Sequence, residues 1–166
     1  AIYWLEEKME GKIPMIEYQN SFNNELLTGI SILSVLSHTK KLEIVKCILI
    51  EPMLNHKELR SILKNSNTVI RSIEELIIKK AAAFSNFNNR FIEALPLSIN
   101  SILLMSELKL LKINGNIILF SGEDFNFKEK SLGQSAKERI LACNKLSEIL
   151  RKETASNLYL NLRVEL

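Results

Sequence analysis

The apolar residues of the chain recur mainly at the three- and four-residue spacing of amphipathic helices. A first helix is predicted to begin at Asn20 or Ser21, where a polar side chain can cap the free N–H groups. The face that this helix would bury consists of Leu26, Leu27, Ile30, Leu33 and Val35. Residues 1–19 carry a break between Gly11 and Pro14, which predicts an irregular segment or a short strand.

The middle of the chain contains a stretch that is apolar nearly all round, in "KKLEIVKCILIEPMLNH". This pattern predicts a central buried helix, which Pro52 must end or kink near residues 48–51. Asn55 is then expected to cap a short helix over "HKELRSILK". A further helix is expected from a cap at Asn67 or Thr68, with the apolar face Val69, Ile73, Leu76 and Ile77.

A helix followed directly by a hairpin is predicted in the second half of the chain. Pro96 suits the first turn of a helix that ends at Leu108, whereas "AAAFSNFNNRFIEALP" before it is ambiguous. Asn114 and Gly115 stand between two short apolar runs, which predicts a hairpin with a type I′ turn. A helix that leads into a small hairpin is typical of a winged-helix domain.

The last helix is predicted over "AKERILACNKLSEILRKE", and an apolar tail follows it. In this tail the period of two indicates a strand, with one face formed by Leu158, Leu160, Leu162 and Val164. Either this face docks onto the core of the chain or it contributes to an interface with another protein. Together the patterns predict a mostly α fold, in which residues 20–166 form a single helical, winged-helix-like domain with a docked C-terminal helix and tail.

Composition narrows the class of protein. The chain has 166 residues, of which 46% are hydrophobic and 25% charged, with a net charge of +3, as in ordinary globular proteins. No N-terminal stretch resembles a signal peptide and no apolar run reaches the length of a membrane span, so we expect a cytoplasmic protein without a membrane partner. Both cysteines, Cys47 and Cys143, fall in apolar helical stretches and are expected to be buried.

Signals of catalysis are nearly absent from the sequence. Asp124 is the only aspartate, and the "GEDFNFKEK" around it lies in an expected loop rather than on a strand. The two histidines, His38 and His56, are far apart, and a surface or capping role is expected for His56. The five glycines form no phosphate-binding loop. We therefore expect no catalytic, cofactor-binding or metal-binding residues.

The helix before the hairpin is a poor reader of DNA. Between Pro96 and Leu108 it contains no Lys or Arg, and Lys112 is the only basic residue of the hairpin. Its apolar residues exceed one core-facing stripe, so it is either buried on two sides or offers a face to a partner, with Ile102 and Met105 as candidates.

A different basic surface is predicted on the two preceding helices, formed by Lys57, Arg60, Lys64, Arg71, Lys79 and Lys80. Because glutamates are interspersed, one interpretation is a solvated charged face. The alternative is a weak phosphate contact by Arg71, Lys79 and Lys80 when a larger complex encloses DNA.

The order of these segments resembles the middle component of three-component ABC-ATPase systems, the small subunit of Lamassu-type antiphage defence. "YQNSFNNELL" stands in place of the family's entry motif and has Ser21 where Pro is usual. "ILIEPMLNHKELRSIL" echoes a Leu-Pro step with Glu51 in place of Leu, and "LPLSINSILLMSELKLLKINGNIILF" follows. "LYLNLRVEL" resembles the family's tail but lacks its Gly, and Leu166 stands where Pro is usual. The resemblance spans residues 15–166.

The resemblance implies a non-catalytic adaptor that joins an SMC- or Rad50-like ABC ATPase to an effector, often a nuclease, held in check until invading DNA is sensed. DNA would then be met indirectly, through the complex. The candidate interface residues of the tail are Leu158, Tyr159, Leu162 and Arg163. The alternative function, from a different class, is a free-standing winged-helix transcription regulator that binds DNA by itself.

Overall fold

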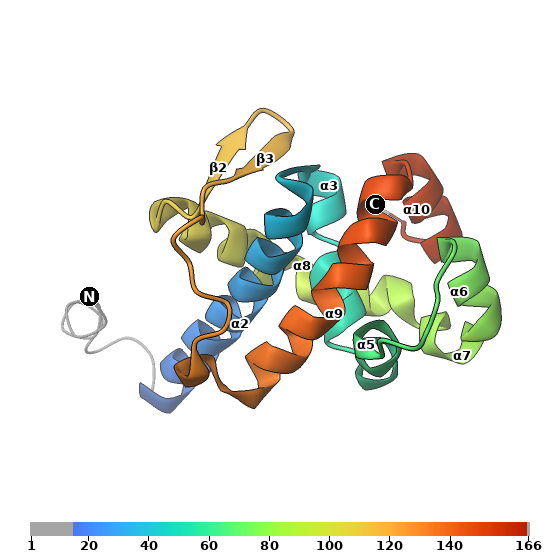
Figure 1. The fold of residues 1–166 in the computed structure, drawn as a ribbon, viewed down its shortest axis with the longest axis horizontal. Helices are drawn as coiled ribbons and strands as arrows, with labels where there is room; N and C mark the ends of the chain where they lie inside the picture. Colours follow the sequence, from blue (N-terminus) through green and yellow to red (C-terminus); the bar gives the residue numbers. More distant parts are fainter. Residues whose placement is uncertain (1–14, 166) are drawn as a thin grey trace.

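The computed structural model describes the backbone of residues 15–165 and the side chains of residues 23–165. Three long helices dominate the fold: α2 (Met15–Thr39), α8 (Phe87–Glu107) and α9 (Gly133–Lys152). Figure 1 shows α2 crossing beside α8 and α9, and it packs against both of them. The predicted mostly α fold with a hairpin is confirmed.

Helix α2 begins earlier than the sequence predicts. Residues 15–19 are helical rather than irregular, and residues 1–14 lie outside the described part of the chain. The buried part of α2 includes small residues, among them Gly29, where an added Cβ would lie 2.2 Å from Cε of Met105. Small side chains at this crossing let α2 and α8 approach closely, so α2 is buried against two partners.

The central apolar stretch is buried as predicted but is not one helix. It divides into the strand β1 (Lys41–Glu43) and the short helices α3 (Ile44–Cys47) and α4 (Ile50–Leu54). The break falls at residues 48–49, just before Pro52. Pro52 is the third residue of α4, where it removes no intrahelical hydrogen bond, so the helix restarts around it instead of ending.

The predicted hairpin consists of β2 (Leu111–Asn114) and β3 (Ile117–Phe120), and β1 joins it as a third antiparallel strand in the order β1-β3-β2. The predicted type I′ turn at Asn114-Gly115 is wrong. Asn114 pairs with Ile117, so the two-residue loop is Gly115-Asn116. Within this turn only Gly115 has a positive φ, at 61°, which is the pattern of a type II′ turn.

Two predicted helix starts are shifted by their capping residues. Helix α5 (Lys57–Lys64) is capped by His56 rather than Asn55. Helix α6 (Ile73–Lys79) is capped by Ser72, whose hydroxyl accepts a hydrogen bond from the Glu75 amide, so the predicted start at Asn67 or Thr68 is wrong. Residues 67–71 are not helical, and Val69 is 71% exposed.

Helix α7 (Ala81–Phe84) precedes α8, which starts at Phe87, nine residues before the predicted start at Pro96. Pro96 is therefore inside α8 instead of in its first turn. The short 3-10 helix η1 (Lys130–Leu132) then leads into α9.

The C-terminal tail forms the helix α10 (Ala155–Leu162), and the predicted strand is wrong. Thr154 caps this helix by accepting a hydrogen bond from the Asn157 amide. Leu158 and Leu162, one helical turn apart, are buried, whereas Leu160 is 78% exposed. The buried face of the tail therefore follows the four-residue spacing of a helix, from Leu158 to Leu162. It does not follow the two-residue alternation that predicted a strand.

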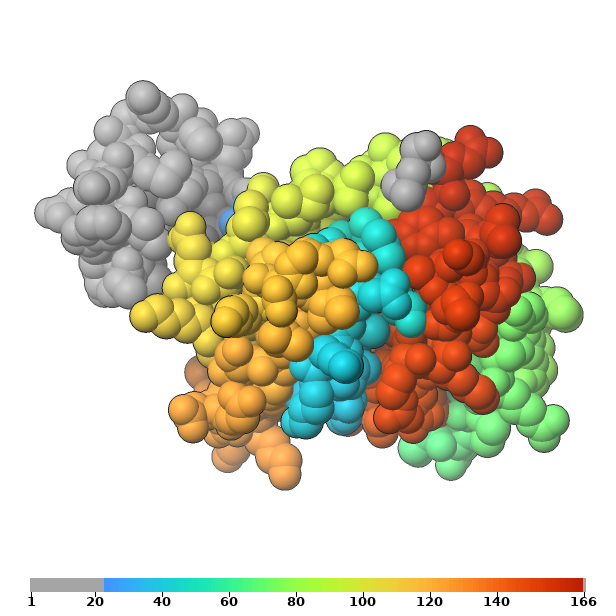
Figure 2. Space-filling model, turned by 90° about the horizontal axis from the view of Figure 1, so that it is seen from above, coloured from blue at the N-terminus to red at the C-terminus, as the bar shows by residue number. Residues whose placement is uncertain are grey.

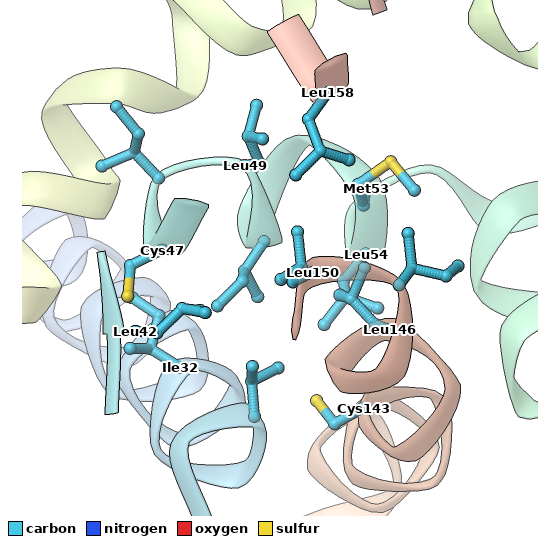
Figure 3. Packing of buried hydrophobic residues seen from close by; sticks show 14 of the residues in the cluster. Ile32, Leu42, Cys47, Leu49, Met53, Leu54, Cys143, Leu146, Leu150 and Leu158 are labelled. Atoms are coloured by element: carbon cyan, nitrogen blue, oxygen red, sulfur yellow. The ribbon is translucent and has the colours of Figure 1, made fainter. Parts of the chain in front are cut away.

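The core gathers around α3 and α4 (Figure 3). Labelled side chains from α2, α9 and α10, such as Ile32, Leu146 and Leu158, lie around Leu49 and Leu54 of this central segment. Leu158 and Leu162 of α10 belong to the same buried cluster, so the tail docks onto the core of its own chain.

Candidate functional site

The side chains that could bind a metal ion do not cluster in the described part of the chain. The described residues contain no group of three or more His, Cys, Asp or Glu side chains placed to hold a metal ion. Asp124 lies exposed in the loop between β3 and η1. No helix of the described part combines the length and apolar character that crossing a membrane demands.

Cys47 and Cys143 are both buried, as the sequence predicts, and the two thiols are free. Burial raises the pKa of each thiol to about 12, so both stay protonated near neutral pH. The Cys143 thiol donates to the Ser31 carbonyl at 3.4 Å. Neither cysteine has the thiolate character of a nucleophile or metal ligand.

His56 has the capping role expected for it. Its Nδ1 accepts a hydrogen bond from the Leu59 amide at 3.4 Å, at the start of α5. Burial and the nearby positive charge of Arg90 lower the pKa of His56, which favours the neutral imidazole that can accept this bond. His38 is exposed in the last turn of α2.

One charged cluster is fully internal. Arg139 of α9 donates to both carboxylate oxygens of Glu51 in α4, at 2.6 and 3.2 Å. The Thr28 hydroxyl of α2 donates to the same carboxylate at 2.9 Å. The exposed fractions of Thr28, Glu51 and Arg139 are 1%, 4% and 8%. Because these side chains are nearly buried and hydrogen-bonded to one another, the cluster ties three helices together.

The tail residues expected to form an interface divide into two groups. Leu158 and Leu162 are 1% and 3% exposed and belong to the core. The half-buried Tyr159 donates from its hydroxyl to the Val45 carbonyl at 2.6 Å and meets the edge of Phe91, with ring centroids 5.9 Å apart. Desolvation raises the pKa of Tyr159 to about 12, so its hydroxyl remains a donor. These three residues hold α10 in place.

The exposed residues of the tail border a groove. Leu160 and Arg163 line a hollow of about 560 Å³ together with Ile77, Phe84 and Asn88, from α6, α7 and α8. We call this hollow the α10 groove. Arg163 is exposed and adopts left-handed backbone angles, with φ at 54°. Of the four candidate tail residues, Arg163 is the one whose side chain is open to a partner.

The two interface candidates on α8 are buried. Ile102 and Met105 are 4% and 1% exposed, because α2 covers that side of the helix. The apolar residues that α8 presents to solvent are instead Ile92, Ile99 and Leu103. The predicted surplus of apolar surface is therefore present, but on a different face of the helix from the candidates.

The basic residues of α5 and α6 are largely neutralised by glutamates. Glu75 forms an ion pair with Lys79 at 2.5 Å, and Glu58 forms one with Lys80 at 3.9 Å. The hydrogen bond from Lys79 lowers the pKa of Glu75. Arg71 is exposed and has no ion pair within the described part of the chain. This arrangement favours a solvated charged face, and a phosphate contact by Arg71, Lys79 and Lys80 stays a prediction.

The sheet contains a basic pair that the sequence analysis missed. Leu119 of β3 pairs with Lys41 of β1 on one side and with Lys112 of β2 on the other. Both lysines are exposed on the face of the sheet opposite to the buried Ile118. The hairpin alone has one lysine on this face, and only the unpredicted strand β1 brings the second.

Comparison with known proteins identifies the family. Residues 22–166 match the model of the ABC-three component (ABC-3C) system Middle Component 3. The chain belongs to this family. The resemblance in the sequence is thereby confirmed at the level of the three-component systems. No curated protein and no solved structure matches this middle component.

As a middle component, the chain works alongside the other components of an ABC-three component system. Figure 2 shows the yellow-green atoms of α8 at the surface of the molecule, beside the orange hairpin. The α10 groove lies where the N-terminal end of α8 meets α6, α7 and α10. Two partly apolar surfaces, the outer face of α8 and the α10 groove, are thus available to partner subunits.

Proposed function

We propose that this middle component is a non-catalytic adaptor of a Lamassu-type antiphage defence complex in the cytoplasm. It connects an SMC- or Rad50-like ABC ATPase to an effector, which we take to be a nuclease, and helps to hold the effector inactive until invading DNA is sensed. The family supports membership of a multi-subunit system, and the finer statements are our proposal.

The observation that carries this proposal is the pair of separate exposed surfaces. Leu103 lies toward the C-terminal end of α8, near the sheet, whereas Leu160 lies in the α10 groove near the other end of α8. Asn88, in the groove, and Leu103 are roughly 22 Å apart along the helix axis, because each residue of a helix adds a rise of about 1.5 Å. One rigid chain with two such surfaces can contact two subunits at once.

A DNA-binding regulator is the alternative function. The Lys41–Leu119–Lys112 row of the sheet is the feature that favours it. However, the exposed face of α8 contains no Lys or Arg, and readers of the major groove need such donors. We therefore expect weak, salt-sensitive binding of DNA by the isolated chain at most.

The experiment is reconstitution with the ATPase and the effector of the same system. Effector activity on plasmid DNA is measured for the effector alone, with the middle component, and with all three components. The proposal predicts that the effector is active alone, is suppressed in the three-component complex, and is released by added linear DNA. Effector activity that is indifferent to the middle component, together with sequence-specific duplex binding by the isolated chain, would favour the regulator.

A further inference from the structure

Four exposed residues of α8 repeat with spacings of four, three and four: Ile92, Pro96, Ile99 and Leu103, which we call the α8 stripe. The exposed fractions of Ile92, Ile99 and Leu103 are 51%, 45% and 51%. The opposite side of the helix carries Met105 in the core. Helix α8 thus has two apolar faces, and within the described residues only one of them is covered.

The spacing of the α8 stripe is that of a heptad repeat. Ile92 and Ile99 are seven residues apart, as are Pro96 and Leu103, so together they occupy alternating d and a positions. A surface helix that packs only against its own domain does not need a second stripe of this kind. The stripe spans about 16 Å, at 1.5 Å per residue, which matches the contact of one helix lying nearly parallel to α8.

One edge of the stripe is acidic. Three polar residues also repeat every seven positions, each directly after a d position, which Ile92, Ile99 and Ser106 occupy: Glu93, Asn100 and Glu107. Such edge positions set partner choice in coiled coils through charge. Arg90 and Lys57 line the same hollow as Glu93, but among the described residues neither Glu93 nor Glu107 forms an ion pair, and residues 91–108 include no Lys or Arg.

A second copy of this chain is a poor occupant of the stripe. In an antiparallel pair of α8 helices, Glu93 and Glu107 of the two copies would face each other across the same edge. In a parallel pair they would face the positions of Asn88 and Ile102, and Ile102 is buried in its own core. Neither arrangement offers the glutamates a cation, and like charges directly opposed are destabilising.

We propose that the α8 stripe is the docking site for a basic amphipathic helix of another subunit of the system. This helix presents Leu or Ile at heptad spacing to the stripe and Lys or Arg to Glu93 and Glu107. The inference rests on the adaptor function and adds the chemistry of the partner segment. The few side chains of the stripe that become fully buried in the interface should contribute most of its binding free energy.

The experiment places a photocrosslinking amino acid, p-benzoylphenylalanine, at position 103 of the middle component in the co-expressed three-component system. Crosslinked peptides are located by mass spectrometry. The expected crosslink lies in a partner segment with apolar heptad spacing and flanking Lys or Arg. The matched control is the same amino acid at Leu141 of α9, which is 63% exposed and outside the stripe, and should give no such crosslink.

Two sets of substitutions test the chemistry separately. Ile99→Gln with Leu103→Gln should weaken partner binding on the order of tenfold or more. Glu93→Gln with Glu107→Gln should weaken it less and reduce its dependence on salt. Leu141→Gln is the control, and circular dichroism verifies the fold of each variant.

Several outcomes would overturn the docking site. They are a crosslink from position 103 to a second copy, to residues 1–22 of the same chain, or to an acidic segment, or no crosslink at all. If the wild-type chain still co-purifies with the other components in these cases, the proposed docking site is rejected and the proposed adaptor function is retained. If the wild-type chain co-purifies with neither component, the adaptor function falls as well.

Discussion

The bidentate pair between Glu51 and Arg139 is a buried ion pair that links distant parts of the chain. It joins α4 to α9, and Thr28 of α2 completes the hydrogen bonding of the carboxylate. The family resemblance places an apolar Leu where this chain has Glu51. Because Arg139 lies 88 residues away in sequence, nothing in the local pattern could pair it with Glu51.

Removing one partner of this pair should be far more damaging than removing both. Glu51→Leu leaves the Arg139 guanidinium buried without a counter-charge, and we expect a loss of about 3–5 kcal/mol in the free energy of unfolding. The double variant Glu51→Leu with Arg139→Met should return to within about 2 kcal/mol of wild type, since apolar residues of similar volume replace buried ion pairs well. Urea denaturation followed by circular dichroism measures both.

The exposed pair of Lys79 and Glu75 is the matched control for that experiment. Its side chains are far more exposed, at 62% and 26%. Lys79→Met should leave the melting temperature nearly unchanged, because water screens exposed ion pairs.

A double variant at Glu51 and Arg139 as unstable as Glu51→Leu alone would show that the internal pair is needed for more than mutual neutralisation.

Arg163 is in a backbone conformation that favours glycine. Its φ of 54° lies in the left-handed region, directly after the last residue of α10. Arg163→Gly should therefore raise the free energy of unfolding by about 0.5–1 kcal/mol, because relief of the left-handed strain exceeds the extra chain entropy. Thermal denaturation provides the measurement. Ser156→Gly, inside α10, is the control and should destabilise; stabilisation by both substitutions would refute the assignment of strain to position 163.

At the scale of single elements, the hairpin provides a discriminating test. Gly115→Val should destabilise the protein by about 1–3 kcal/mol, because a β-branched side chain resists positive φ. Asn114→Val should be tolerated, since Asn114 is a strand residue paired with Ile117. Comparing the two melting temperatures distinguishes the observed turn from the type I′ turn that the sequence predicts, in which both substitutions would be harmful.

The sequence predicted the elements whose apolar spacing fits either a helix or a strand but not both. The hairpin strands and α9 were predicted to within a few residues, whereas the tail was not. Leu158, Leu160 and Leu162 fit a period of two, but Leu158 and Leu162 also fit a helical turn, and the Thr154 cap favours the helix. The choice between these structures depends on packing against distant residues, such as the bond from Tyr159 to Val45.

The sequence did not predict which residues of the helix before the hairpin would be exposed. It indicated surplus apolar surface between Pro96 and Leu108, and Ile99 and Leu103 are exposed there. It could not tell which face is covered, because that depends on where α2 crosses. Gly29 of α2 brings the crossing to Met105, which buries the candidates Ile102 and Met105 instead.

At the scale of the whole molecule, stability should fall in alkaline solution. Burial raises the pKa of Cys47 and Cys143 from 9 in the unfolded chain to about 12 in the fold. Between these values the unfolded state loses protons that the folded state keeps, so the stabilisation is complete below about pH 9 and is lost as the pH rises toward 12.

Urea denaturation across this alkaline range measures the effect. The slope of the unfolding free energy against pH should become shallower in the Cys47→Ala variant, since one titrating group is removed. Leu141→Ala, on the surface of α9, is the control and should keep the wild-type slope. An unchanged slope in Cys47→Ala would contradict the assignment of the buried thiol as a source of the alkaline instability.

The arrangement of the described part of the chain is compatible with the connector role that we propose. Some of its charged groups hold helices together, as Glu51 and Arg139 do, and others pair on the surface, as Glu75 and Lys79 do. Its two partly apolar surfaces, the α8 stripe and the α10 groove, lie on elements that the central helices fix relative to each other. This separation underlies the claim that the middle component bridges two other subunits.

The most direct measurement of bridging is the amount of effector that co-purifies with a tagged ATPase subunit in the presence and absence of the middle component. We predict that effector recovery depends on the middle component, and that Leu103→Gln and Leu160→Gln each release only one of the two partners. Equal recovery of the effector without the middle component would contradict the account.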